Sequence, residues 1–259
     1  MPWSRVSNLI SILLLLFFTT PITSAPAAAD LVLEGSLEGG LRYSITATRK
    51  GVPIPASEIK LKPLETYQLG NPPSKATRLN PRANPIANSS NWCGSVNTAP
   101  SGKSIAVAAW VGIDGDSWTS ALLQAGSVCE RSVWVPLGAY AITSLSISPG
   151  QWLEVTINAT STTSAQISLM NLHTGVNYNV ILTNGPTLAR VNANWVVERP
   201  YYGSTLVTMP AFSDVWFTYA SASLTPSGSL GILGAKQYQI PGFCGSEEYD
   251  NTAQVSYVP

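Results

Sequence analysis

Charged side chains and histidine are scarce in this 259-residue chain. Only 11% of the residues are charged and His173 is the single histidine, whereas 45% of the residues are hydrophobic. A typical soluble domain has about a quarter of its residues charged, so uncharged polar side chains must cover much of this surface. Few groups therefore titrate, which suits a protein that meets large changes of pH. A lone histidine excludes metal sites built from several histidines, and we expect neither a metal nor a cofactor.

Long hydrophobic runs are also scarce, and the one present lies near the N-terminus. Arg5 precedes an apolar run over 9–18, and small residues at 23–25 offer a cleavage site. This pattern predicts a secretory signal peptide over 1–25. The run is about half of the ~20 residues that a membrane span needs. We therefore expect a secreted, extracellular protein without a stable membrane anchor; an uncleaved anchor is the alternative.

Only three cysteines are present, and export would determine whether they can form disulfides. An oxidising compartment permits disulfides, but Cys93, Cys129 and Cys244 cannot all pair within one chain. The sequence does not say which two pair. Asn-X-Ser/Thr sequons at Asn88 and Asn158 predict N-glycosylation of an exported chain.

Helical periodicity, internal repeats, Gly-rich phosphate loops and basic-aromatic patches are absent, so we expect no nucleic-acid partner. Instead, short apolar or alternating runs rich in Val, Ile, Thr, Trp and Tyr are separated by Gly, Pro, Asn and Ser. Their spacing is typical of an all-β, antiparallel two-sheet sandwich. The runs are 105–113, 121–124, 132–137, 153–157, 165–170, 176–182, 194–198, 206–209, 215–219, 230–233, 237–240 and 254–258.

Charge is unevenly distributed, although the formal net charge is zero. Residues 26–82 contain eight Lys or Arg and five acids, and the chain from 83 onward contains five bases and nine acids. A cationic leader on an anionic body favours docking of the leader by charge. A solvated linker without consequence is the alternative.

Proline divides the chain after the signal. Residues 26–85 form a Pro-rich, basic, propeptide-like segment, which ends in the Pro-rich stretches 71–74 and 80–85. Such stretches are typical of exposed, protease-sensitive linkers. The remaining residues 86–259 are long enough to bury a sizeable core as one domain. We expect this domain to be a monomer.

Two apolar segments each carry one polar residue. Gln124 lies within 121–126, and Glu198 lies within 193–200. A polar side chain in an apolar strand costs free energy unless it is hydrogen-bonded, so we expect these two residues to be partners. A carboxyl facing a carboxamide is a workable acid–base device. Gln124 satisfying a backbone group, and Glu198 paired with Arg199 at an edge, are the alternatives.

Five short motifs, taken together, carry a resemblance to a known family. The most specific is Trp-Val-Gly-Ile-Asp-Gly-Asp at 110–116, with Gln124 following at a fixed spacing. Over about 86–220 the set resembles the glutamic peptidases, or eqolisins, which are secreted acid proteases. The motifs lie at 89–96, 110–116, 134–136, 146–151 and 193–198.

This resemblance implies a fold and a set of roles. It implies a concanavalin- or jelly-roll-like sandwich of two antiparallel sheets, with a basic propeptide that inhibits the enzyme. The catalytic Gln and Glu of the family fall on Gln124 and Glu198. Trp110 and Asp114 fall beside that site, and we assign them to substrate binding together with Trp134.

The chain departs from the family pattern at three places. Arg131, Ser132 and Val133 stand where the family has Trp, Tyr and Glu. Asn194 replaces the first Glu of the last motif, and Cys93 replaces a small residue. The departure at 131–133 bears on peptide specificity, because the resemblance places substrate-binding side chains of the family there.

These observations predict an acid endopeptidase made as a zymogen, acting on polypeptides and held inactive by its own propeptide. Glu198 would activate water and then protonate the leaving amine, while Gln124 would stabilise the oxyanion. The alternative is a catalytically inactive sandwich used as a binding or cell-surface module. A glycosidase using Asp114 and Glu198 is a third possibility.

Overall fold

The computed structural model describes most of the chain after the predicted signal. The described residues are 27–64, 76–77, 86–89, 92–98, 111–126, 131–135, 139–148, 150–198, 201–202, 205–206, 214–224 and 227–258. The predicted signal peptide, Trp110 and Cys129 lie outside them.

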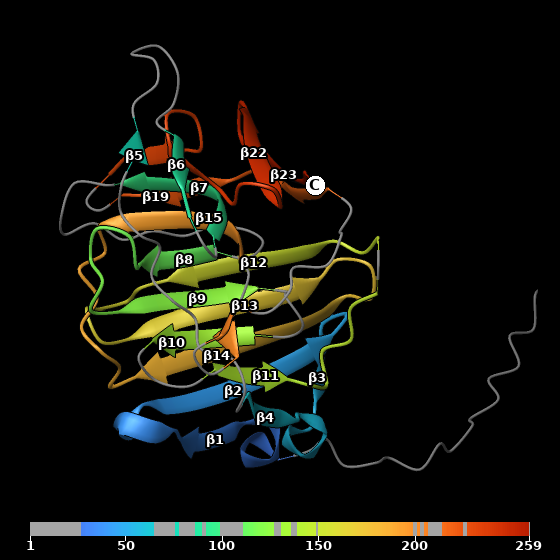
Figure 1. Cartoon of the computed structure of the whole chain (residues 1–259). Helices are drawn as coiled ribbons and strands as arrows, with labels where there is room; N and C mark the ends of the chain where they lie inside the picture. The colour runs from blue at the N-terminus through green and yellow to red at the C-terminus, as the bar shows by residue number, and fades with distance from the viewer. Residues whose placement is uncertain are drawn as a thin grey trace, which may run out of the picture.

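Two large sheets form the body of the molecule (Figure 1). The first has the order β1-β2-β14-β13-β12, and β3 also pairs with β2. Its strands are β1 (Leu33–Ser36), β2 (Arg42–Arg49), β3 (Val52–Ile54), β12 (Leu153–Asn158), β13 (Ala165–Asn171) and β14 (Val176–Thr183).

The second sheet has ten strands in the order β4-β11-β10-β9-β8-β15-β7-β21-β6-β5. All its pairs are antiparallel except β21 with β6, which are parallel. Its strands are β4 (Leu61–Leu64), β5 (Ala76–Thr77), β6 (Ile86–Asn88), β7 (Trp92–Thr98), β8 (Val111–Asp114), β9 (Leu122–Gly126), β10 (Arg131–Val135), β11 (Ala139–Ile142), β15 (Asn192–Glu198) and β21 (Lys236–Gln239).

Smaller elements complete the described fold. A three-stranded sheet of order β18-β23-β22 contains β18 (Val215–Phe217), β22 (Cys244–Tyr249) and β23 (Thr252–Tyr257). Two short pairs are β16 (Tyr201–Tyr202) with β17 (Thr205–Leu206), and β19 (Ser221–Ser223) with β20 (Ser229–Gly231). The helices of the described residues are the 3-10 turns η1 (Ala28–Leu31), η2 (Glu38–Gly40) and η3 (Ala56–Glu58). Among these residues no helix has the length and apolar character needed to cross a membrane.

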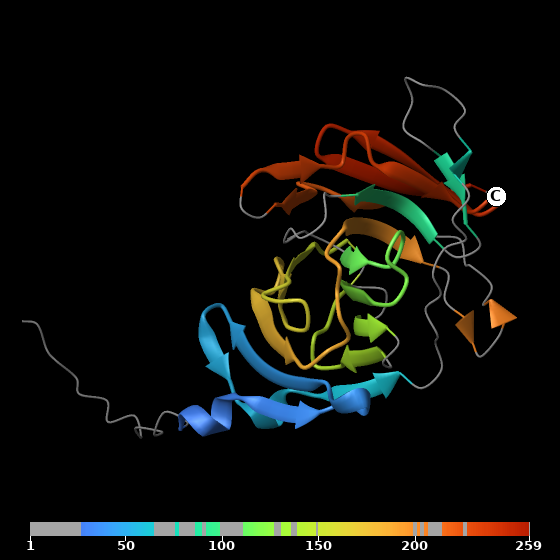
Figure 2. The same ribbon diagram turned by 90° about the vertical axis from the view of Figure 1, so that its left-hand side faces the viewer.

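The two large sheets stack face to face, as Figures 1 and 2 show, with β12 and β13 of the first sheet against β8 and β9 of the second. Burial alternates along β13, which has one face in the core, whereas every residue of β8 and β9 is buried. Strands covered on both faces read as continuous apolar runs. The predicted all-β, antiparallel sandwich is confirmed.

The predicted leader contributes strands to both large sheets. β2 pairs with β14, and β4 pairs with β11 (lower strands in Figure 2). Leu41, Ile45, Ile54 and Ile59 of this segment are buried in the common core. Between described residues, backbone pairing and apolar packing hold the leader to the body, and no ion pair joins them. Docking by charge and the boundary near residue 85 stay predictions.

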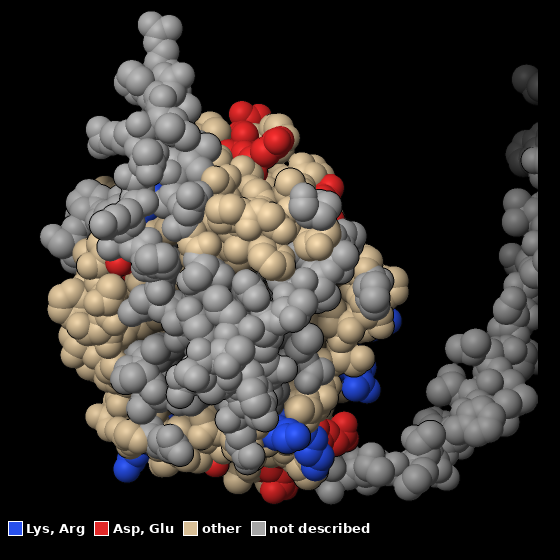
Figure 3. All heavy atoms as spheres, in the orientation of Figure 1, with Lys and Arg blue, Asp and Glu red and all other residues tan. Residues whose placement is uncertain are grey.

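Among the described residues on the face shown in Figure 3, charged side chains are sparse, as the composition predicts. Asn158 is exposed at the end of β12, where a glycan could extend into solvent. Asn88 ends β6, and its side chain lies outside the description. Glycosylation of both residues stays a prediction.

Gly94 permits an unusually close approach of β7 to β15. Its φ is +147°, and an added Cβ would lie 2.1 Å from the carbonyl oxygen of Trp195 and 2.8 Å from the Cα of Val196. Both obstacles are backbone atoms, which cannot turn away as a flexible side chain can. A side chain at position 94 would therefore separate two central strands.

We expect Gly94→Ala to destabilise the fold by about 3 kcal/mol, because the clash forces β7 away from β15. Gly51→Ala is the matched control, since Gly51 also has positive φ (+81°) but would bring its Cβ within 4 Å of nothing. That control should cost about 1 kcal/mol. Urea unfolding of both variants measures their losses of unfolding free energy. Equal losses would show that the close approach of β7 to β15 does not depend on Gly94.

Glu248 of β22 is a partly buried carboxyl at the contact of β22 with β7 and β21. The side chain of Gln237 and the backbone of Gly234 hydrogen-bond it. Burial raises the pKa of Glu248 from 4.5 to about 7, although these hydrogen bonds oppose the shift. A carboxyl with a raised folded-state pKa stabilises the fold below its unfolded pKa and loses that contribution as pH rises through the folded value.

We expect the wild-type protein to lose stability relative to Glu248→Gln between pH 4.5 and 7, because only the wild-type carboxyl must ionise in a buried place. Denaturant unfolding of both proteins at pH 4 and pH 7 tests this. Identical changes in unfolding free energy would show that Glu248 does not titrate as described.

Candidate functional site

The two residues of the predicted dyad lie on two strands separated by a third. Gln124 is in β9 and Glu198 is in β15, with β8 between these strands. Gly112 of β8 pairs with Gln124 on one side and with Asn194 on the other. Residues that pair across strands share a face of the sheet. Gln124, Gly112 and Asn194 therefore form one row, which we call the amide row.

Glu198 lies on the same face as the amide row, because it is four positions after Asn194 and side chains alternate with a period of two. It ends β15 opposite Trp92 of β7. Only 5% of Glu198 is exposed, and Trp92 is fully buried. The structure thus brings both predicted dyad residues to one face, with the carboxyl at the end of the strand.

The expected direct hydrogen bond between Gln124 and Glu198 does not form. Both polar atoms of the Gln124 side chain are buried without a hydrogen-bond partner, and Oδ1 of Asn194 is too. The reason is the register: β8 separates the two strands, and Glu198 is four positions along from the residue in line with Gln124. Buried amides without partners are rare in proteins and costly. Their presence is typical of a site that receives a polar ligand.

Gly112 allows close packing at the middle of the amide row. A Cβ at this position would lie 3.1 Å from Nδ2 of Asn194 and 3.1 Å from Cδ1 of Leu122. The carbonyl oxygen of Leu123 would lie 3.2 Å away as well. The neighbours of Gly112 therefore pack against its backbone, and a side chain at this position would displace the Asn194 carboxamide.

Asp114 connects the end of β8 to the segment that leads into β15. Its carboxylate accepts the backbone N–H groups of Arg190, Val191 and Asn192 at 2.9, 2.8 and 3.4 Å. Burial raises the pKa of Asp114 above its ordinary value, and these N–H groups oppose that shift. The Asp114 carboxylate is thus occupied by backbone N–H groups of the protein itself. Its role in substrate binding stays a prediction.

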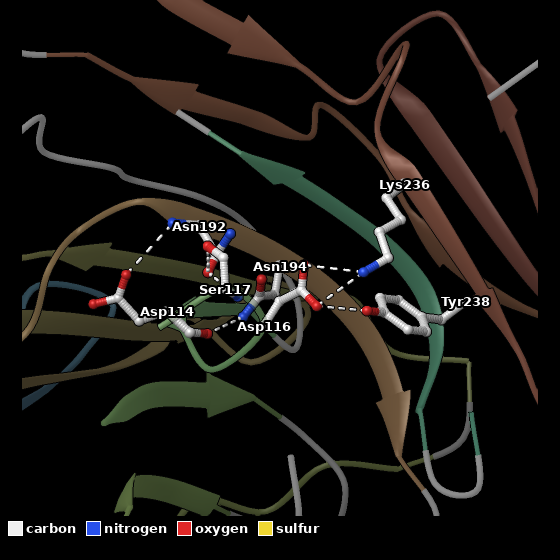
Figure 4. A network of polar contacts seen from close by, with 7 residues as sticks. All are labelled: Asp114, Asp116, Ser117, Asn192, Asn194, Lys236 and Tyr238. Atoms are coloured by element: carbon white, nitrogen blue, oxygen red, sulfur yellow. Dashed lines mark hydrogen bonds and ion pairs between the residues drawn. The ribbon is translucent and has the colours of Figure 1, made fainter. Parts of the chain in front are cut away.

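Two asparagines of β15 hold the turn that follows β8 (Figure 4). Nδ2 of Asn194 donates to the carbonyl oxygen of Asp114 at 2.7 Å. The backbone N–H and the hydroxyl of Ser117 both donate to Oδ1 of Asn192 at 3.0 Å. The turn is therefore fixed to the strand that carries the predicted catalytic carboxyl.

A second polar group joins the turn after β8 to β21. Asp116 accepts hydrogen bonds from Lys236 at 3.0 Å and Tyr238 at 2.5 Å (Figure 4). Burial, followed by the hydrogen bond to Asp116, raises the pKa of Tyr238, so this phenol stays protonated. The Tyr238 ring meets Trp92 edge to face, with centroids 6.1 Å apart. Trp92 is thereby held opposite Glu198.

The region that departs from the family pattern adjoins the amide row. Val133 of β10 pairs with Gln124, and Arg131 pairs with Gly126. Trp134 pairs with Leu123, one position away, and its side chain lies outside the description. The substitution at 133 therefore stands next to the predicted catalytic amide, and the substrate-binding role of Trp134 stays a prediction.

Three residues of this site were not selected from the sequence. Asn194 could have been found by the argument used for Gln124, because it is a polar residue in an apolar strand on the same face as Glu198. Lys236 and Tyr238 carried no such signal, since β21 joins β7 only through long-range pairing. No group of three or more His, Cys, Asp or Glu suited to a metal occurs in the described part of the chain.

Comparison with known sequences gives two curated relatives. Aspergillopepsin-2 of Aspergillus niger is 35% identical over 127 residues, covering 44% of this chain and 45% of the relative. Scytalidopepsin B of Scytalidium lignicola is 34% identical over 112 residues, covering 40% and 43%. The chain thus spans less than half the length of the curated relatives it matches.

Comparison with solved structures extends over more of the chain. Aspergilloglutamic peptidase from Aspergillus niger matches with a TM-score of 0.52 and 28% identity, over 60% of this chain and 99% of that one. Scytalido-glutamic peptidase bound to a peptide-based transition state analog matches with a TM-score of 0.53 and 27% identity, over 65% and 98%. These similarities confirm the resemblance to glutamic peptidases.

A sequence model of the Peptidase A4 family matches residues 93–256, which contain β8, β9 and β15 together with every residue of the amide row. The chain belongs to the Peptidase A4 family.

Proposed function

We propose that this protein is a secreted glutamic endopeptidase that hydrolyses peptide bonds of polypeptides with Gln124 and Glu198. The observation that carries the proposal is the buried Gln124 amide without a partner, on the same sheet face as the nearly buried Glu198. Membership of the Peptidase A4 family supports the same reaction.

Glu198 has the chemistry of a general base and acid. As a carboxylate it removes a proton from the attacking water, and the carboxylic acid so formed protonates the departing amine. Packing by Trp92, itself held by Tyr238, fixes the carboxyl at the end of β15. A fixed carboxyl needs little reorganisation when the water attacks.

Gln124 supplies the complementary group. Its free amide N–H is available for the oxygen that becomes negative when water adds to the peptide carbonyl. Asn194 adds an acceptor, since Nδ2 is used by the Asp114 carbonyl while Oδ1 has no partner. We assign this Oδ1 to the N–H of a substrate peptide bond.

The zymogen part of the proposal concerns the leader. β4 pairs with β11, which adjoins β10, and β10 pairs with the strand of Gln124. The leader is thereby connected through the sheet to the site, and the basic segment 26–85 would act as an intramolecular inhibitor until it is removed.

Glu198→Gln should lower kcat by about 1000-fold or more, because an amide cannot accept the proton of water. Gln124→Ala should lower kcat by about 100- to 1000-fold through loss of an oxyanion donor. Each variant is first freed of its leader and then incubated at acid pH with an unfolded protein. Mass spectrometry of the fragments over time measures kcat for both variants.

Glu154→Gln and Gln166→Ala are the matched controls, since both residues are exposed strand residues of the other sheet. They should leave the rate unchanged. Full activity of Glu198→Gln would overturn the dyad. A folded, leader-free wild-type protein that cleaves nothing at any pH would favour the binding module, which the Val133 substitution beside Gln124 also suits.

Asn194→Ala should raise KM about tenfold with a smaller change in kcat, because it removes a hydrogen bond to bound substrate. Asn192→Ala is the control, since it removes another buried amide, which contacts Ser117. Both variants should lose thermal stability, but only Asn194→Ala should raise KM. An unchanged KM would leave Asn194 with a purely structural role.

A further inference from the structure

Two cysteines far apart in the sequence meet behind the proposed site. Cys93 belongs to β7, where it pairs with Val197 of β15, and its side chain is fully buried. Cys244 begins β22, where it pairs with Tyr257 of β23, and it is 3% exposed. Neither thiol takes part in the proposed reaction.

Cys93 and Cys244 are free thiols in the structure, and they lie close enough to hydrogen-bond to each other. The backbones around them are also held together. The hydroxyl of Ser246, two residues after Cys244, donates to the carbonyl oxygen of Gly94 at 3.3 Å and to that of Tyr238 at 3.4 Å. β22 is thus fixed against β7 and β21 next to the contact, which gives the two sulfur atoms a defined approach.

We propose that Cys93 and Cys244 form a disulfide bond in the exported protein, leaving Cys129 as the unpaired cysteine. The reaction is thiol–disulfide exchange with an oxidising disulfide, such as oxidised glutathione or a dithiol oxidase. One thiolate attacks that disulfide and releases a thiol; the second thiolate then attacks the mixed disulfide and releases another. Two protons leave the cysteines, the S–S bond forms, and the oxidant is reduced to two thiols.

The timing of bond formation follows from the surroundings of Cys93. Both thiols are buried, so an external disulfide has no access to them once the strands have closed. The bond therefore forms as β22 docks on β7 during folding. After that, the bond ties the β18-β23-β22 sheet to the strand that places Trp92 opposite Glu198.

The first experiment maps the cysteines directly. The full chain is produced by secretion, unfolded without reductant in iodoacetamide, digested and analysed by mass spectrometry. We expect a linked pair of peptides containing Cys93 and Cys244, which separates on reduction, and alkylated Cys129. Alkylation of both Cys93 and Cys244 without reduction, or a link from either to Cys129, would overturn the proposal.

The second experiment separates a covalent bond from the packing of two buried thiols. Cys93→Ala, Cys244→Ala and the double variant should each lower Tm by about 10 °C, because a disulfide that closes a long loop restricts the unfolded chain. Cys129→Ala is the control and should show no such loss. Reductant should lower the wild-type Tm to the level of the variants. Additive losses in the double variant, with no effect of reductant, would show packing alone.

Discussion

The pairing of β15 on both of its edges is the constraint on which the rest of the structure depends. This strand lies in the middle of the ten-stranded sheet, between β8 and β7, and it carries both Asn194 and Glu198. A shift of one residue in either register would turn these side chains to the opposite face. The side chains of Asp114 and Asn192 oppose such a shift by tying the turn after β8 to the start of β15. The strand that carries Asn194 and Glu198 is therefore also the strand whose pairing decides which face these side chains occupy.

Two glycines make that central region possible, in different ways. Gly94 allows the backbones of β7 and β15 to come closer than any side chain would permit. Gly112 lies in β8, on the other side of β15, where a Cβ would crowd Asn194, Leu122 and the carbonyl oxygen of Leu123. Both glycines thus contribute to close packing, Gly94 against β15 and Gly112 at the centre of the amide row. The strands on either side of β15 therefore both depend on the absence of a side chain.

The fold and part of the candidate site could be predicted from the sequence, because both depend on local patterns. Short apolar runs with turn residues between them identified the strands, and a polar residue in an apolar run identified Gln124 and Glu198. The direct contact expected between these two was wrong, because composition does not reveal that β8 lies between their strands. Lys236 and Tyr238 could not be found for the same reason: they reach the site only through pairing of distant segments. The contact of Cys93 with Cys244 likewise depends on how β22 packs, which no spacing rule contains.

The strands of the leader would give the proposed proteolytic maturation a second step. A cut in the chain after β4 breaks one peptide bond, but β2 stays hydrogen-bonded to β14 and β4 to β11, with apolar side chains in the shared core. The product of the cut is therefore a nicked complex of two chains. Release of the leader would then uncover backbone N–H and C=O groups along β14 and β11, two new sheet edges of the kind that other polypeptides can extend. A polypeptide bound as a strand along β11 would lie in the same sheet as Gln124, two strands away.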